Sequence, residues 1–287
     1  MHNGSGGGTQ MSKKKLNKIL VYALLILGLL TVVLPLYITF ITSFKSTSET
    51  ITNYLSLPTK WYFGNFKYIL FKKGFWRALL NTAVITAVVA AGDVILMPML
   101  GYSVARRMNE DRKWRGFYFY LLIGIFIPFQ VKMIPLVQMM STLKMMNPVG
   151  LAILCIGSTT CEATFLYTGY LAGIPRDLEE AASIDGASTF YTYRRIIFPL
   201  MQPIIATSVI KDCLWTWNDF TLPLIILNRS PQYWTIVLYQ YNFQSEAGVD
   251  YGLVFACLCI SMIPILVIYL FLQRQIMSGL TSGAVKG

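Results

Sequence analysis

Histidine and charge are scarce in this chain, and each shortage excludes a class of function. The one histidine, His2, lies in a leader (1–10) that is typical of a tag, so no imidazole remains for general-base catalysis or a zinc site. Charged residues make up 13% of the 287 residues, against about 25% in an average soluble domain. With 55% hydrophobic residues and a mean hydropathy of +0.55, the composition excludes a soluble cytosolic enzyme and a disordered chain.

Sequence patterns for metal, redox and nucleotide chemistry are also missing. The five cysteines lie inside apolar blocks and none forms a CxxC pair, so we interpret them as small core residues. The sequence contains no GxxxxGK[ST] phosphate loop, so ATP has no site of that kind here. We therefore predict that the chain is not an enzyme, has no catalytic residue, and binds no metal or cofactor itself.

Apolar blocks long enough to cross a bilayer, which takes about 20 residues per helix, recur along the chain. Six can be drawn, at 19–43, 80–104, 116–137, 150–172, 200–227 and 253–273. The sequence therefore predicts an all-α membrane protein with six transmembrane helices. Prolines inside these blocks, among them Pro128 and Pro203, predict bent or broken helices.

The net charge of +11 is interpreted as the basic flanks of membrane spans rather than as a surface for nucleic acid. Lysine and arginine are more frequent in one set of connections than in the other. The richer set comprises the N-tail (11–18), the 105–115 loop, the 173–199 loop and the C-tail (274–287). Because basic loops tend to stay in the cytoplasm, we expect both termini there. The 44–79 loop carries six basic residues and argues the other way.

Charged side chains also occur inside the apolar blocks, at Asp93, Lys132, Glu162, Lys211 and Asp212. A charge at the bilayer centre costs about 3 kcal/mol or more, so these side chains should face the bundle interior or water. Some of them could line a solute path, and Glu162, in the middle of its block, is the favoured path-facing residue. The alternative is that they satisfy one another inside the bundle.

The 173–199 connection is too polar to span a membrane, yet it carries helix signals. Pro175 and the acidic residues after it favour the start of a short helix, and Gly186 favours a left-handed stop. Ser188 can then cap a second helix. One face of that helix carries Phe190, Tyr193 and Ile197. We predict a compact helix–turn–helix, with an ordinary loop and one amphipathic helix as the alternative.

Part of this connection resembles the EAA signature of ABC importer permeases, which reads E-A-A, three residues, G, nine residues and I-x-L-P. The matching residues are Glu180, Ala181 and Ala182, then Gly186, then Ile196–Pro199. The one departure is Phe198 where leucine is usual. Four further stretches resemble the carbohydrate branch, in particular the six-span subunit of maltose-type permeases. They are the exit of the first span at Ser43–Lys45, Asp185–Ser188, Trp217–Phe220 followed by Pro223 and Leu224, and the tail Gly279–Gly287, and the resemblance covers residues 16–287.

The resemblance implies a type I ABC importer permease fold with a permease domain at 19–273 and a cytoplasmic coupling helix in the 173–199 loop. Glu180 would pair with a basic residue of the ATP-binding subunit, Ala181 and Ala182 would contact that subunit closely, and Gly186, next to Asp185, would make the turn. The tail would insert between two ATPase subunits. Its candidate contact residues are Gly279, Thr281, Gly283 and Lys286.

The partners implied are a second permease subunit, an ATP-binding subunit dimer that holds ATP and Mg²⁺, an extracytoplasmic solute-binding protein and a sugar, in a bacterial cell membrane. In the family the external 228–252 loop faces the binding protein. Its aromatic residues Tyr233, Trp234 and Tyr241 are therefore candidates for contact with that protein or with the sugar. Aromatic residues are also enriched at any membrane interface, so anchoring is the alternative.

Two other functions compete with the permease hypothesis. An ion-coupled secondary transporter would use Glu162, Asp93 and Lys211 as coupling groups, but it leaves the EAA-like loop unexplained. A membrane-embedded enzyme would need a histidine-based dyad or a metal-binding set, and the sequence has neither.

Overall fold

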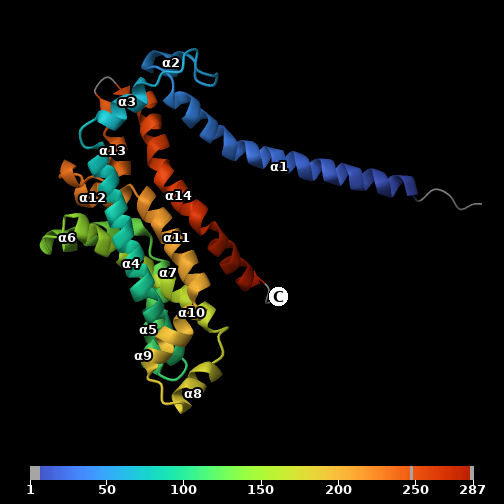
Figure 1. The fold of residues 1–287 in the computed structure, drawn as a ribbon, viewed down its shortest axis with the longest axis vertical. Coiled ribbons are helices and arrows are strands. Elements are labelled where there is room, and N and C mark those ends of the chain that lie inside the picture. The colour runs from blue at the N-terminus through green and yellow to red at the C-terminus, as the bar shows by residue number, and fades with distance from the viewer. Residues whose placement is uncertain (1–6, 246–247, 285–287) are drawn as a thin grey trace, which may run out of the picture. The chain divides into compact units, whose positions relative to one another are not determined.

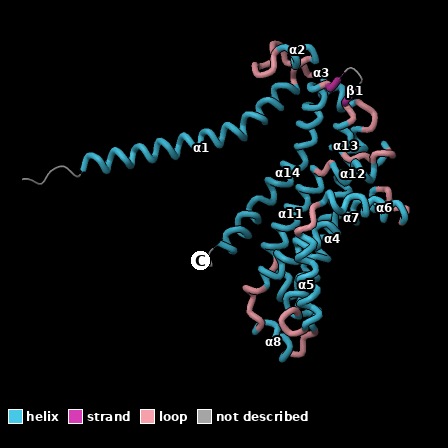
Figure 2. Tube along the Cα trace, turned by 180° about the vertical axis from the view of Figure 1, so that it is seen from behind, coloured by secondary structure: helices cyan, strands magenta, loops and turns pink. Residues whose placement is uncertain are grey.

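The computed structural model describes residues 7–245 and 248–284, and the surroundings of the side chains in 15–243 and 249–270. Residues 1–6 of the predicted leader lie outside the described residues. The described chain is almost entirely helical (Figures 1 and 2), which confirms the predicted all-α class. The exception is a short antiparallel pair, β1 (Gln244–Ser245) and β2 (Gly248–Val249).

Among the described residues, four helices are long and apolar enough to cross a membrane. They are α1 (Gly7–Ser43), α4 (Phe75–Arg107), α7 (Pro148–Leu171) and α14 (Tyr251–Ala284). Two bent pairs pass the same test: α5 (Arg112–Ile125) with α6 (Phe129–Thr142), bent by 105°, and Thr189–Leu200 with α11 (Gln202–Asn218), bent by 74°. Counted as one span each, the pairs bring the number to six, as predicted, but the second pair begins within the predicted 173–199 loop and ends before the predicted 200–227 block does.

Proline accounts for the break in the 116–137 block. Pro128 is the residue before α6, and because it lacks an N–H and restricts the residue preceding it, the helix cannot run on from α5. Figure 1 shows α6 turned away from α5. The 200–227 block is divided as well, into α11 and α12 (Thr221–Leu227), where Asp219 Oδ1 accepts the N–H of Thr221 at 2.9 Å.

The remaining described elements are short. They are α2 (Thr47–Thr52), α3 (Gly64–Phe71), α8 (Asp177–Ile184), α9 (Thr189–Thr192), the π-helical turn η1 (Tyr193–Ile197), α10 (Phe198–Leu200), the 3-10 turn η2 (Pro231–Tyr233) and α13 (Ile236–Tyr241).

The chain forms two compact units, and the larger one comprises 72–242 together with residues from 261 onward. Within it α4 packs along α7 and α11, and the three helices lie side by side in both views (Figures 1 and 2). Gly101 permits the closest approach, because a Cβ there would collide with the side chain of Tyr167, which is completely buried. Met97, Leu171 and Ile197 belong to the same core cluster.

The smaller unit comprises 7–71 and 243–260 of the described chain. Asn65 holds the end of α1 by donating from Nδ2 to the carbonyls of Ser43 (2.9 Å) and Lys45 (2.8 Å). The Lys45 side chain is fully buried, and its Nζ donates to the carbonyls of Asn53 (2.5 Å) and Tyr54 (3.2 Å). One of the six basic residues in 44–79 is therefore enclosed by protein rather than exposed. Lys45 thus counts less as evidence that the 44–79 loop lies in the cytoplasm.

Candidate functional site

The 173–199 connection folds as the predicted helix–turn–helix. Helix α8 is followed by Gly186 at φ +79°, a left-handed conformation that a side chain would strain. Ser188 then caps α9, since its Oγ accepts the N–H of Tyr191 at 3.3 Å. Pro175 lies just before α8 rather than within its first turn.

The second helix differs from the prediction in length and in one contact. It continues past the arginines at 194 and 195, through η1 and α10, to Leu200. Tyr193 and Ile197 are buried, but Phe190, which the prediction placed on the same face of the helix, is 62% exposed, so the three do not form one buried face. The physical reason is that Tyr193 makes the contact with α4, its ring 5.2 Å from that of Tyr102, while Phe190 lies at the rim of a small cavity there.

Helices α8 and α9 enclose an open cleft of about 750 Å3. Four of the predicted coupling residues line it, namely Ala181, Ala182, Asp185 and Gly186. Ala182 is nearly buried against its own helix pair, whereas Glu180 is exposed on α8. Ile184 is 87% exposed at the end of α8. The pair thus presents small residues, three acidic side chains and several apolar side chains to the outside, of which Ile184 is the most exposed.

A second glutamate, Glu179, anchors α8 inside the protein, and sequence reasoning missed it. Its Oε1 accepts Arg106 Nε at 2.6 Å, and its Oε2 accepts the Tyr102 hydroxyl at 2.7 Å. The Arg106 and Glu179 side chains are only 14% and 18% exposed. Arg106 also donates to the carbonyls of Leu171 (3.2 Å) and Ile174 (3.3 Å), so one guanidinium ties together α4, α7 and α8.

Arg176 extends this anchor on the other side of α8. Its Nη2 donates to the Arg106 carbonyl at 2.5 Å, and its Nη1 pairs with Glu110. The signals in the sequence are the basic end of α4, at Arg106, and the acidic start of α8, at Glu179, but their pairing depends on a fold that brings them together from 73 residues apart. We call the contacts among Tyr102, Arg106 and Glu179 the α8 anchor.

A polar cavity of about 610 Å3 lies within the membrane-spanning part of the larger unit. Lys211 Nζ pairs there with Glu162 Oε2 at 2.7 Å and with Asp212 Oδ1 at 2.9 Å. Asp212 is 2% exposed, whereas Glu162 and Lys211 are half-exposed. Lys132 also lines the cavity. Lys211 and Asp212 therefore satisfy one another inside the bundle, as the alternative supposed, while Lys211 and Glu162 also line the cavity.

Asp93 does not belong to the described lining of this cavity, although the competing transporter hypothesis grouped it with Glu162 and Lys211. It is fully buried, and its Oδ1 accepts the Thr159 hydroxyl at 3.1 Å. Asp93 and Asp212 interact electrostatically. The structure therefore links Glu162, Lys211, Asp212 and Asp93 into one internal network, in which Glu162 and Lys211 are the more exposed members and line the cavity.

The aromatic residues of the 228–252 loop divide into exposed and packed ones. Tyr233 and Tyr241 are 38% and 48% exposed. Trp234 is partly buried, and its Nε1 donates to the Asn228 carbonyl at 3.1 Å. None of the three is among the described residues that line the polar cavity.

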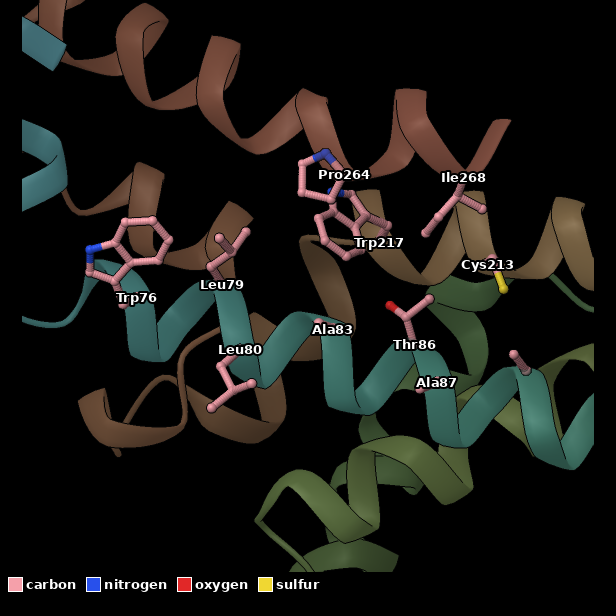
Figure 3. Close-up of a pocket in the computed structure, with 11 residues that line it drawn as sticks. Trp76, Leu79, Leu80, Ala83, Thr86, Ala87, Cys213, Trp217, Pro264 and Ile268 are labelled. Atoms are coloured by element: carbon pink, nitrogen blue, oxygen red, sulfur yellow. The ribbon is translucent and has the colours of Figure 1, made fainter. Parts of the chain in front are cut away.

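An apolar groove of about 640 Å3 lies between α4, α11 and α14. Figure 3 shows Pro264 and Ile268 of α14 facing Trp217 and Cys213 of α11, with Leu79 and Thr86 on α4. Its lining is almost entirely hydrocarbon, so it offers a polar solute very few hydrogen-bond partners.

The predicted tail contacts cannot be placed as side chains. The backbone of α14 continues through Gly279, Thr281 and Gly283 to Ala284. The surroundings of those side chains, and Lys286 altogether, lie outside the described residues.

Comparison with known proteins gives the family. The family of "Binding-protein-dependent transport system inner membrane component" matches residues 97–280. The chain is 39% identical over 275 residues to the multiple sugar-binding transport system permease protein MsmG of Streptococcus mutans, covering 96% of this chain and 99% of that protein. It is 34% identical over 268 residues to the probable starch degradation products transport system permease protein AmyC of Thermoanaerobacterium thermosulfurigenes, covering 92% and 97%.

The fold is also known from solved structures. The chain matches a chain in the crystal structure of a bacterial ABC transporter that imports the acidic polysaccharide alginate, with a TM-score of 0.78, 22% identity, and coverage of 95% of this chain and 99% of that one. This likeness confirms the predicted type I permease fold. On the family match and the relatives together, the chain belongs to the inner-membrane permease components of binding-protein-dependent ABC transport systems.

Proposed function

We propose that this chain is a permease subunit of an ATP-driven, binding-protein-dependent importer of sugars or oligosaccharides. Relatives named for multiple sugars, for starch degradation products and for melibiose, raffinose and stachyose support this substrate class. The observation that carries the proposal is the exposed pair α8–α9, where the EAA-like residues surround an open cleft. An ion-coupled transporter has no use for such a surface.

Coupling to the motor would occur through this helix pair. Glu180 is the exposed charge for a basic residue of the ATP-binding subunit, and Ala181 and Ala182 provide a surface without bulk. A helix that transmits a rigid-body movement from the ATPase to the spans must be firmly attached to a span. The α8 anchor, with Glu179 held by Arg106 and Tyr102, supplies that fixation by tying α8 to the span α4.

The remaining partners follow from the same proposal. A second permease subunit would complete the path, ATP and Mg²⁺ would bind to an ATPase dimer, and the C-tail from Gly279 onward would reach that dimer. Tyr233 and Tyr241, both exposed, would face the solute-binding protein, and the partly buried Trp234 would be a third contact. This arrangement requires both termini and the 173–199 loop to lie on the cytoplasmic side of a bacterial cell membrane.

Co-purification and energetics test the proposal. A tagged chain isolated from its native membrane should bring an ATPase with it, and sugar uptake should stop when ATP is depleted. Uptake that survives ATP depletion and collapses with an uncoupler would instead support the ion-coupled alternative. Replacing Glu180 with Ala should leave membrane insertion intact and lower the ATPase stimulation caused by loaded binding protein. Unchanged stimulation would contradict the role of Glu180.

A further inference from the structure

We propose that the polar cavity beside Lys211 is a sugar-contacting site contributed by this subunit, with the Trp215 ring as its platform and Glu162 and Lys211 as its hydroxyl partners. The inference rests on the proposed function and adds the residues that would meet the solute. The Lys211 ion-pair network is otherwise unexplained, because an ATP-driven permease does not need it for coupling to an ion gradient.

The cavity has the size and position of a ligand site. Its volume of about 610 Å3 falls within the range of about 300–1,000 Å3 that is usual for small-molecule pockets. Helices α5, α6, α7, α11 and α12 all contribute to its lining. Because α6 bends away from α5 by 105°, Ile125 and Phe129 line it from two different directions.

The two tryptophans of α11 differ in burial, and the comparison indicates that the Trp215 ring is not needed for packing. Trp217 is 4% exposed, and its Nε1 donates to the Ser261 carbonyl at 3.1 Å, so it holds α11 against α14. Trp215 is 42% exposed and lines the polar cavity. An aromatic face next to polar groups suits a sugar ring, whose C–H face is apolar and whose rim carries hydroxyls.

The ion pairs leave hydrogen-bonding capacity on the cavity side. A lysine ammonium has three N–H donors, and Lys211 uses two of them on Glu162 and Asp212, so one has no partner among the described residues. Glu162 is 51% exposed and can accept from hydroxyls as well. Asp212, in contrast, is buried, and its role is to hold Lys211 in place.

The charges of the lining favour an uncharged sugar. Two ammonium groups, Lys132 and Lys211, face three carboxyl groups, Glu162, Asp212 and Asp219. The carboxylate of an acidic sugar would need an excess of positive charge to offset its desolvation. The described lining has no such excess, because its carboxyl groups outnumber its ammonium groups. The site therefore fits a neutral oligosaccharide and disfavours one built from uronic acids.

Photocrosslinking during turnover tests for contact directly. The photoreactive p-benzoylphenylalanine is placed at position 215 or, as the matched control, at Trp76, a tryptophan that is 59% exposed in the apolar groove. The full complex in proteoliposomes receives ATP, its binding protein and tritiated maltotriose, raffinose or arabinotriose. We expect at least tenfold more tritium at 215 than at 76 for a transported sugar. Equal labelling, or labelling at 215 by tritiated trigalacturonate in place of the neutral sugars, would overturn the inference.

Transport by the substituted complexes provides a second measurement, with Trp215→Ala, Trp215→Phe and Trp76→Ala compared. Trp215→Ala should reduce uptake about tenfold while the ATPase is still stimulated by loaded binding protein, and Trp215→Phe should restore most of the uptake. Normal uptake with Trp215→Ala would refute the site and leave the proposed function standing. Sugar uptake by the unaltered complex that does not depend on ATP would instead contradict the proposed function, and the site, which rests on it, would fail as well.

Discussion

Acidic residues are used in opposite ways in the helix pair α8–α9 and in the polar cavity. In the helix pair, Glu179 is held by Arg106 and Tyr102 while its neighbour Glu180 stays exposed. In the cavity, Glu162 and Asp212 are both bound to one lysine. On α8, the bonded Glu179 holds the helix in place while the exposed Glu180 is available to a partner protein. In the cavity, Glu162 and Asp212 share Lys211, so the lining keeps its structure when a neutral solute binds. Four predictions test this contrast.

Lys211→Met should have the largest effect on stability, because it leaves the buried Asp212 carboxylate without its cation. Removing one partner of a buried pair costs about 3–5 kcal/mol, and since Lys211 is 39% exposed we expect about 2 kcal/mol here. Thermal unfolding of the purified complex measures the loss. Adding Asp212→Asn should recover most of it, and failure of this second change to help would show that the pair is not the cause.

Gly186→Val should cost about 1–2 kcal/mol in the helix pair, because a residue with a Cβ is strained at φ +79°. No atom lies within 4 Å of the added Cβ, so the effect comes from the backbone alone. We expect about a tenfold lower stimulation of the ATPase by loaded binding protein. Gly169→Val, in α7 and equally open, is the control, and an equal loss there would remove the special role of the turn.

Glu179→Gln and Glu180→Gln separate anchoring from docking. Losing a charge-assisted hydrogen bond should make the first variant less stable by about 1–2 kcal/mol, while the exposed Glu180 should change stability by less than about 0.5 kcal/mol. Protease accessibility of the 173–199 loop reports the first effect, and the affinity of the isolated ATPase for the permease reports the second. If both variants behave alike in both assays, the division of roles between the two glutamates is wrong.

Lys45→Met should have the smallest effect on stability. Lys45 differs from Lys211 in being a buried amine that donates to backbone carbonyls rather than to a carboxylate. Burial lowers the pKa of Lys45 below its ordinary value of 10.5, an effect that Glu49 partly opposes. The unfolded chain therefore binds more protons than the native one between the lowered pKa and 10.5, so stability should rise with pH in that interval. Comparing unfolding of the wild type and Lys45→Met across alkaline pH isolates this term, and parallel pH profiles would contradict it.

Local signals made the helix pair predictable from the sequence. Gly186 and Ser188 act on the backbone within a few residues, so their roles could be read without any tertiary structure. Pro128 likewise predicted the break between α5 and α6, but the 105° bend depends on what α6 packs against. The shared face of Phe190 and Tyr193 could also be read locally, but the exposure of Phe190 is set by how α9 meets α4.

Long-range pairing put the cavity and the anchor out of reach of such reasoning. Glu179 looked like one more acid at a helix start, and only the fold brings Arg106 and Tyr102 to it. Lys211 and Glu162 were correctly singled out as unusual, but their direct pairing, and the place of Trp215 beside them, follow from the packing of α7 against α11.

The π-helical turn at Tyr193–Ile197 bears on why the distance from Gly186 to Pro199 in this chain should resist change. A π turn contains more residues than an α turn, and it is rare because its hydrogen bonds span five residues. Deleting one residue from the π turn would let it relax into regular α geometry and would leave the preceding residues almost unrotated, because the π turn takes up about one residue more than an α turn. Deleting a residue from the regular helix α9 would instead rotate everything before it by about 100°. The exposed face of α8 would then point in a new direction, and a motor bound to it would transmit force along a different line.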